Sequence, residues 1–185
     1  MTAAATENRH PLRIRRISRA LAHACLALII ALPLAVIGYW LIADAAQLAV
    51  RAQLPVLAIQ APLQDWQRAA GALITLLPVT LLLIGLWHAR QCFRLFAARE
   101  VFNAGAVRCL QRFAGWVMAS VAASMVAATA ISVVLTLNNP PGMRHLAISI
   151  GTDQIFTLFF AGMVWLMAAV IGQGQALAEE NATFI

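Results

Sequence analysis

The chain has 185 residues, of which 62% are hydrophobic and only 11% are charged. Soluble domains average about 45–50% apolar and about 25% charged residues, and a globule of this length has too little interior to bury the excess. The formal charge is +6, and all 13 basic residues are arginine. The composition therefore excludes a soluble enzyme, a disordered chain and a disulfide-stapled secreted module, and it predicts an integral membrane protein. Because the arginines lie beside the hydrophobic runs, we expect no direct binding of nucleic acid.

Four apolar segments are each long enough to cross about 30 Å of hydrocarbon, which takes roughly 20 helical residues. They lie at about 20–42, 69–88, 113–137 and 154–172. Each is predicted to be a helix, because a chain in lipid must satisfy its own backbone hydrogen bonds and the alternation typical of a membrane β-barrel is missing. The first segment follows arginines as a signal peptide would. Its apolar run exceeds the about 7–15 residues of a signal h-region, so we expect a retained span.

The arginines are divided unevenly between the segments that flank the spans. Ten lie in residues 1–19 and 89–112, and three lie in the other two connections. The arginine-rich side is predicted to be cytoplasmic. We therefore expect a multi-pass membrane protein with both termini in the cytoplasm. It would have a cytoplasmic Arg-rich tail (1–19), a single membrane domain (20–172) and a short acidic cytoplasmic tail (173–185).

The connection between the second and third spans, residues 89–112, is expected to form a cytoplasmic helical hairpin. Asp65 is a typical N-cap residue for a helix that runs from Trp66 to about Ala98 without a stop signal. A break at residues 99–103 precedes a second helix, which begins at Ala104 and continues through the third span. Each helix is expected to have about 33 residues, or roughly 50 Å. The predicted fold class is all-α: a four-helix transmembrane bundle with helices 2 and 3 extended into this hairpin.

The arginines of the hairpin have two interpretations. In the first, they only keep this connection on the cytoplasmic side, as the positive-inside rule describes, and attract anionic headgroups. In the second, they mark a docking surface for a partner. An aromatic residue at the tip favours docking, and the acidic tail can pair with hairpin arginines. The residues expected to contact a partner are Arg99, Glu100, Phe102, Asn103, Glu179 and Glu180.

Small residues recur every four positions in the third span, at Gly115, Ala119, Ala123 and Ala127. Such residues let membrane helices approach closely, so this row is predicted to be a helix-packing face, although alanine is common throughout the chain. A second row contains Ser120 and Ser124, whose hydroxyls can line a path for a small molecule. Five aromatic residues fall near predicted span ends, as an aromatic belt requires: Tyr39, Trp40, Trp66, Trp87 and Trp116.

The search for chemistry finds no catalytic motif in a usable context, and the middles of the spans carry no ionisable residue. We therefore expect no enzymatic activity and no catalytic residues. Four residues at the predicted inner interface are candidates for binding a metal or haem: His23, His88, Cys92 and Cys109. Cysteine is also a common apolar core residue, and the spacing matches no established ligand signature, so we expect no cofactor.

Two stretches of the chain resemble a known family. Residues 95–103, LFAAREVFN, resemble a hairpin motif written roughly LF-x-x-G-E-[VI]-F-[TN]. Residues 174–185, GQALAEENATFI, resemble a closing G-x-x-L-x-E-[ED] motif. With the four spans, these motifs resemble the bacterial inner-membrane family catalogued as domain of unknown function 2975, although Arg99 stands where the family usually has Gly. The resemblance implies four spans, cytoplasmic ends and, for some members, an association with small helix-turn-helix regulators. It supplies no enzymatic activity and no catalytic residues that could be carried over to this chain.

Three hypotheses for the function follow. The first is a non-enzymatic membrane partner or sensor that signals through its cytoplasmic hairpin to a protein in the membrane or cytoplasm, for example a helix-turn-helix regulator. The second is an accessory subunit of a larger membrane complex, or a small-molecule carrier that uses the hydroxyl-lined face of the third span. The third is a haem- or metal-binding membrane protein.

Overall fold

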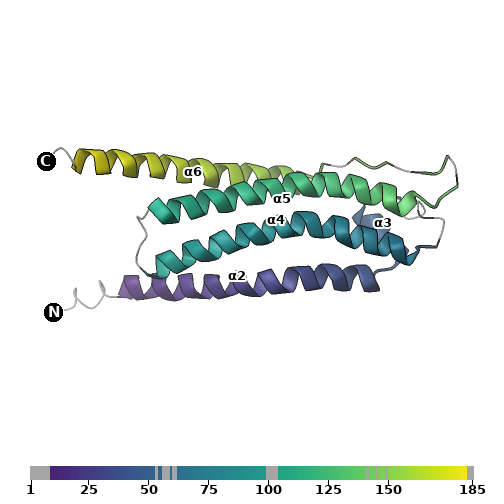
Figure 1. The fold of residues 1–185 in the computed structure, drawn as a ribbon, viewed down its shortest axis with the longest axis horizontal. Coiled ribbons are helices and arrows are strands. Elements are labelled where there is room, and N and C mark those ends of the chain that lie inside the picture. Colours follow the sequence, from purple (N-terminus) through teal and green to yellow (C-terminus); the bar gives the residue numbers. More distant parts are fainter. Residues whose placement is uncertain are drawn as a thin grey trace. The chain divides into compact units, whose positions relative to one another are not determined.

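The computed structural model describes residues 9–52, 54–55, 59, 62–98, 104–140, 142–144, 146–148 and 150–182, with side chains from residue 15 to residue 177 except Ala104. These residues form five helices and no strand (Figure 1). The helices are α2 (Arg9–Ile42), α3 (Ala45–Arg51), α4 (Asp65–Ala97), α5 (Ala104–Thr136) and α6 (Thr152–Ala182). The prediction of an all-α fold with four long helices, as a four-helix bundle requires, is confirmed.

Four of the helices are long and apolar enough to cross a membrane. The segments that meet this condition are Arg15–Ile42, Asp65–Ala97, Gly105–Thr136 and Thr152–Leu177. They expose many large apolar side chains, among them Leu34, Leu73 and Phe156, each more than 60% exposed. Water would oppose this exposure and hydrocarbon favours it. The chain is therefore a multi-pass membrane protein.

Helices α4 and α5 each have 33 residues, as expected from the caps and the apolar runs. At the start of α4, the backbone N–H of Gln64 donates to Oε1 of Gln67 at 3.0 Å, so the side chain of Gln67 reaches back as in a capping box. α4 begins at Asp65 itself and continues through Pro78. Residues 99–103, where the break between the two helices was expected, lie outside the described part of the chain.

The chain divides into two compact units. Unit 1 comprises Met1–Ile29, Leu83–Val117 and Phe159–Ile185, and unit 2 comprises Ile30–Leu82 and Met118–Leu158. Each long helix contributes a segment to both units. Unit 1 and unit 2 each contain a cavity.

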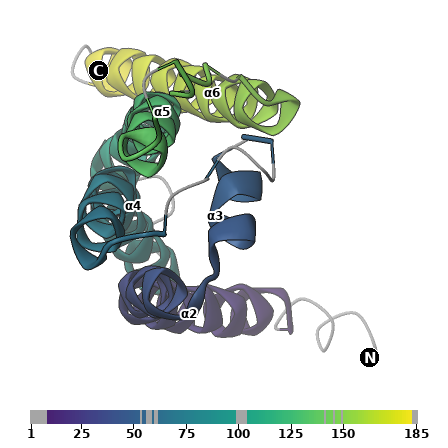
Figure 2. The same ribbon diagram turned by 90° about the vertical axis from the view of Figure 1, so that its right-hand side faces the viewer.

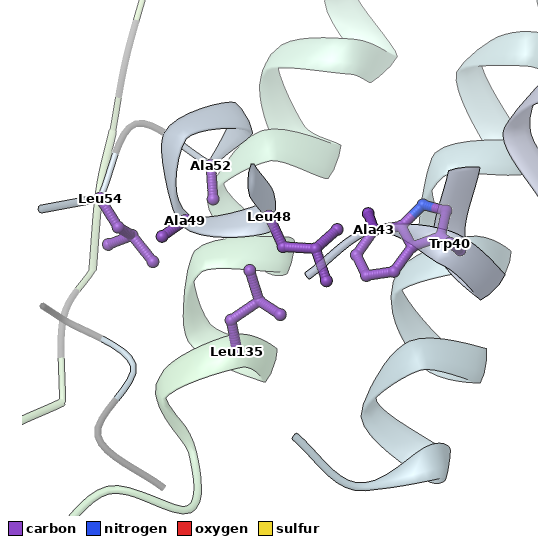
Figure 3. Close-up of a cluster of buried hydrophobic side chains, with 7 residues drawn as sticks. All are labelled: Trp40, Ala43, Leu48, Ala49, Ala52, Leu54 and Leu135. Atoms are coloured by element: carbon purple, nitrogen blue, oxygen red, sulfur yellow. The ribbon is translucent and has the colours of Figure 1, made fainter. Parts of the chain in front are cut away.

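Unit 2 contains a hydrophobic cluster around the short helix α3, which the sequence had not predicted. Leu48 and Ala49 of α3 pack with side chains from α2, α5 and the segment after α3 (Figure 3). Figure 2 shows α3 next to the C-terminal end of α2, facing α4 and α5. α3 begins after an N-cap, because Oδ1 of Asp44 accepts a hydrogen bond from the backbone N–H of Gln47 at 2.8 Å. The whole cluster consists of Trp40, Ala43, Leu48, Ala49, Ala52, Leu54 and Leu135.

Trp40 is part of this core. Its side chain is only 2% exposed, and its Nε1 donates to Oγ1 of Thr75 at 3.1 Å. The expectation of an aromatic belt is therefore wrong for Trp40. Burial of the indole is favourable here because its polar N–H has a partner on α4.

Candidate functional site

The candidate site is a cavity of about 400 Å³ in unit 2, which we call the unit 2 cavity. Its walls come from α2, α3, α4, α5 and the start of α6. Sites for small molecules in proteins usually have about 300–1,000 Å³, so this cavity is large enough for such a ligand. The lining residues are Trp40, Leu48, Arg51, Ala52, Thr75, Pro78, Val79, Leu82, Ser120, Ser124, Ala127, Ala128, Ile131, Asp153 and Gln154.

Small residues of α5 leave room for this cavity. Ser120, Ser124 and Ala128 are spaced four residues apart and line one wall, together with Ala127. Side chains four residues apart lie on the same helix face, so the row presents small groups to the cavity rather than bulky ones. The space therefore follows directly from the residue types on this face of α5.

The residues of the predicted helix-packing row on α5 differ in how deeply they are buried. Ala127 is buried and lines the cavity, whereas Ala119 and Ala123 are half-buried. Among the described residues, a Cβ atom built on Gly115 would meet no atom within 4 Å, apart from its immediate surroundings in the helix. No close contact with another described helix therefore requires glycine at residue 115.

The hydroxyl groups in the cavity wall donate to backbone carbonyls. Oγ of Ser120 donates to the carbonyl of Pro78 at 2.8 Å, and Oγ of Ser124 donates to that of Val121 at 2.7 Å. A hydroxyl has one hydrogen and two lone pairs. Because the hydrogen is used on a carbonyl, each hydroxyl oxygen can offer only acceptor lone pairs to a ligand.

Thr75 completes the polar part of the wall. Its Oγ1 donates to the carbonyl of Gly71 at 2.7 Å and accepts from Nε1 of Trp40. Among the lining residues, Arg51 and Asp153 are charged, exposed and of opposite sign. The guanidinium carbon of Arg51 lies 5.2 Å from the centroid of the Tyr39 ring, within the range of a cation–π contact. The cavity thus combines an apolar wall, hydrogen-bond acceptors and balanced charge.

The residues expected to dock a partner fall outside the described side chains. Arg99, Glu100, Phe102 and Asn103 lie outside the described residues altogether. Glu179 and Glu180 belong to the helical backbone of α6, and their side chains are not described. The docking surface therefore stays a prediction.

The candidate metal or haem ligands mostly have partners in the protein. Nδ1 of His23 lies 2.7 Å from the carbonyl oxygen of Arg19. Sγ of Cys92 donates to the carbonyl of Ala106 and Sγ of Cys109 to Oε1 of Gln91, both at 3.8 Å. Nδ1 of His88 is buried with no hydrogen-bond partner among the described atoms. Within the described residues, no group of three or more His, Cys, Asp or Glu side chains is placed to hold a metal ion.

Sequence reasoning missed several residues of the unit 2 cavity, among them Leu48 and Arg51 on α3. Asp44 and Gln47 form a D-x-x-Q pattern, which resembles a capping box and could have predicted the start of this helix. Its length of seven residues made it difficult to recognise, because a helix this short depends on packing for its stability. For Trp40 and Thr75, which meet across 35 residues of chain, we find no sequence signal.

The four apolar helices and the exposed apolar side chains define the class of this protein: it is an α-helical multi-pass membrane protein. The family described as "Protein of unknown function (DUF2975)" matches residues 52–185. The chain belongs to this family. No curated protein and no solved structure matches the chain.

Proposed function

We propose that this protein is a non-enzymatic membrane sensor that binds a small molecule in the unit 2 cavity and signals through the hairpin at residues 89–112. The observation that carries the proposal is the cavity of about 400 Å³, which five helices line. A concave site of this size with a mostly apolar lining and a few polar groups is typical of sites that bind small molecules.

The lining suggests the chemical class of the ligand. The apolar residues favour a mostly hydrocarbon body, and the hydroxyl oxygens of Ser120 and Ser124 favour a group that donates a hydrogen bond. Arg51 and Asp153 contribute opposite charges, so no strong net charge on the ligand is required. The ligand is therefore a small apolar molecule with an N–H or O–H group.

The test fills the cavity with a larger side chain. Ser124→Leu places additional atoms at the cavity wall, whereas Ala122→Leu adds a similar side chain on the exposed face of the same helix. The full-length wild type and both variants are purified in mild detergent, and the small molecules that each releases are identified by mass spectrometry. We expect a molecule that is released from the wild type and from Ala122→Leu but not from Ser124→Leu. Identical sets from all three proteins would rule out ligand binding in this cavity.

The proposed output is contact between the hairpin and a protein partner, for which a helix-turn-helix regulator is our candidate. The sequence places the aromatic residue Phe102 at the tip of an arginine-rich connection. A photo-crosslinking amino acid at residue 102 should capture a discrete protein in cells, and the same amino acid at the exposed residue Leu146, in the connection before α6, serves as the control. If residue 102 gives only lipid adducts, the docking proposal fails.

We also propose the bacterial inner membrane as the location, with both termini cytoplasmic. The ten-to-three division of arginines supports this orientation. The bilayer is then the first partner of the chain, because the exposed apolar side chains need hydrocarbon around them.

A second candidate function is a small-molecule carrier or an accessory subunit of a larger membrane complex. The hydroxyl-bearing wall of α5 also suits a molecule in transit. Uptake of a compound that Ser124→Leu abolishes and Ala122→Leu preserves would favour the carrier. Purification of a stable larger complex in mild detergent would favour the accessory subunit.

A further inference from the structure

Unit 1 contains a second cavity, which we call the unit 1 cavity. It measures about 600 Å³ and lies between α5 and α6. Its polar lining residues are Arg108 and Gln111 from α5, with Gln173 and Gln175 from α6. The two helices pack closely at its edge, where a Cβ atom on Gly172 would lie 3.3 Å from Cγ1 of Val107. The two helices therefore form the walls of this cavity.

The side-chain amide of Gln175 is the unusual feature of the cavity. Both its Nε2 and its Oε1 are buried, and neither has a hydrogen-bond partner among the described atoms. At least about 90% of buried polar groups in proteins are satisfied, and leaving one unsatisfied destabilises the fold. The amide faces a cavity that it shares with a guanidinium group, so a polar occupant can satisfy it.

The charge around the cavity selects the kind of occupant. By sequence, the residue ranges of unit 1 contain ten arginines and four glutamates, so the unit carries a net positive charge. Such a unit attracts anions. The planar guanidinium of Arg108 presents several N–H donors, which match the oxygens of phosphate.

We propose that the unit 1 cavity binds a phosphate group, with Arg108 and the amide of Gln175 as its main ligands. Phosphate oxygens accept hydrogen bonds from the guanidinium and from Nε2 of Gln175, and a hydroxyl of the same molecule or a water donates to Oε1. The headgroup of an anionic phospholipid and free phosphate share this chemistry. Basic pockets between membrane helices on the cytoplasmic side are known to bind such headgroups. This site is separate from the ligand cavity of the proposed function and does not depend on it.

The experiment measures the shift in the thermal unfolding midpoint of the purified full-length protein in dodecyl maltoside. The probes are dioleoylphosphatidylglycerol, dioleoylphosphatidylcholine and sodium phosphate, the last against sodium chloride of equal ionic strength. The variants are Arg108→Gln and Gln175→Leu. The matched control is Arg112→Gln, an exposed arginine one turn further along α5 that does not line the cavity.

We expect a saturable upward shift with phosphatidylglycerol, phosphate or both, and none specific to phosphatidylcholine. A shift with phosphatidylglycerol alone identifies a lipid headgroup, and a shift with sodium phosphate identifies the phosphate group as sufficient. Arg108→Gln and Gln175→Leu should weaken the apparent affinity about tenfold or more, because each removes a hydrogen bond to a charged group. Arg112→Gln should keep the affinity of the wild type.

Several results would overturn the proposal. These are equal shifts with the two phospholipids, no shift with any probe, or the same loss in Arg112→Gln as in Arg108→Gln. Without a probe, Gln175→Leu should unfold at or above the midpoint of the wild type, because it removes an unsatisfied buried amide. A much lower midpoint would mean that the amide already has a partner in the protein, and this result also contradicts the proposal.

Discussion

Gly71 on α4 makes room for the most buried aromatic side chain of unit 2. A Cβ atom at residue 71 would overlap Cη2, Cζ3 and Cζ2 of the Trp40 indole. One turn further along α4, Oγ1 of Thr75 accepts a hydrogen bond from the indole N–H. Glycine is therefore required at residue 71 by a close contact between helices, and its conformational freedom is not needed in the interior of a helix.

We predict opposite effects of alanine at two glycines of the long helices. Gly71→Ala should lower the free energy of unfolding by about 1–3 kcal/mol, because the indole has to move. Gly115→Ala should leave it unchanged or raise it by up to about 1 kcal/mol, because alanine favours helix and meets open space. Unfolding in sodium dodecyl sulfate, followed by circular dichroism, measures both. An equal loss in the two variants would show that residue 115 lies in a tight helix contact.

Two adjacent residues of α4 connect this helix to its neighbours in unit 2. Nη1 of Arg68 donates to the carbonyls of Trp40 and Ala43, at 3.1 and 2.8 Å, where α2 ends. Nε2 of Gln67 donates to the carbonyl of Val134 on α5 at 2.8 Å. The last carbonyls of a helix have no partner within it, and a cation there also interacts favourably with the helix dipole. The ends of α2 and α5 are thus held by side chains from α4.

Removal of the guanidinium of Arg68 should destabilise the fold. We expect Arg68→Leu to lower the free energy of unfolding by about 1.5–3 kcal/mol, the usual contribution of a hydrogen bond to a charged group. Arg68→Lys should lose less, because one ammonium can still reach a carbonyl. Arg144→Leu, which changes an exposed arginine in the same unit, is the control and should change the stability little. Equal effects of Arg68→Leu and Arg144→Leu in the same detergent titration would contradict this role.

At the scale of the whole molecule, apolar surface and charge together determine how the chain relates to a bilayer. The four long helices expose apolar side chains along their length, and ten of the 13 arginines fall in residues 1–19 and 89–112, next to the predicted spans. Hydrocarbon would solvate the exposed apolar side chains, and under the positive-inside rule the two arginine-rich segments support the orientation that we propose. Arg68 is one of the three arginines outside these two segments, and its guanidinium donates to backbone carbonyls.

The proposed orientation, with both termini cytoplasmic, leads to a prediction about reporter fusions. Bacterial alkaline phosphatase needs its disulfides and is active only after export from the reducing cytoplasm. A fusion after Leu54 should be active in cells, and a fusion after Ala98 should be inactive. Activity assays with an antibody control for expression measure the difference. The reverse pattern would mean that the arginine-rich side faces outward.

The sequence alone determined the class of the protein, the number of its long helices and the lengths of two of them, whereas α2 and α6 extend beyond the spans predicted at 20–42 and 154–172. The length of an apolar run, a capping residue and a break between two helices are properties of neighbouring residues, so α4 and α5 were predicted to have about 33 residues before any packing was considered. Membership of the family was recognised from short motifs for the same reason.

Only the tertiary structure decided which residues surround a cavity and which fill a core. Trp40 is hydrogen-bonded to Thr75, which lies 35 residues further along the chain, and Gln67 is hydrogen-bonded to Val134, which lies 67 residues further along. The row of small residues on α5 was visible in the sequence, but whether it faced a helix or an open space depended on the side chains opposite it. Likewise, α3 is stable because Leu48 is buried against Trp40 and Leu135. Burial is a property of segments that are distant in the chain, and no local pattern encodes it.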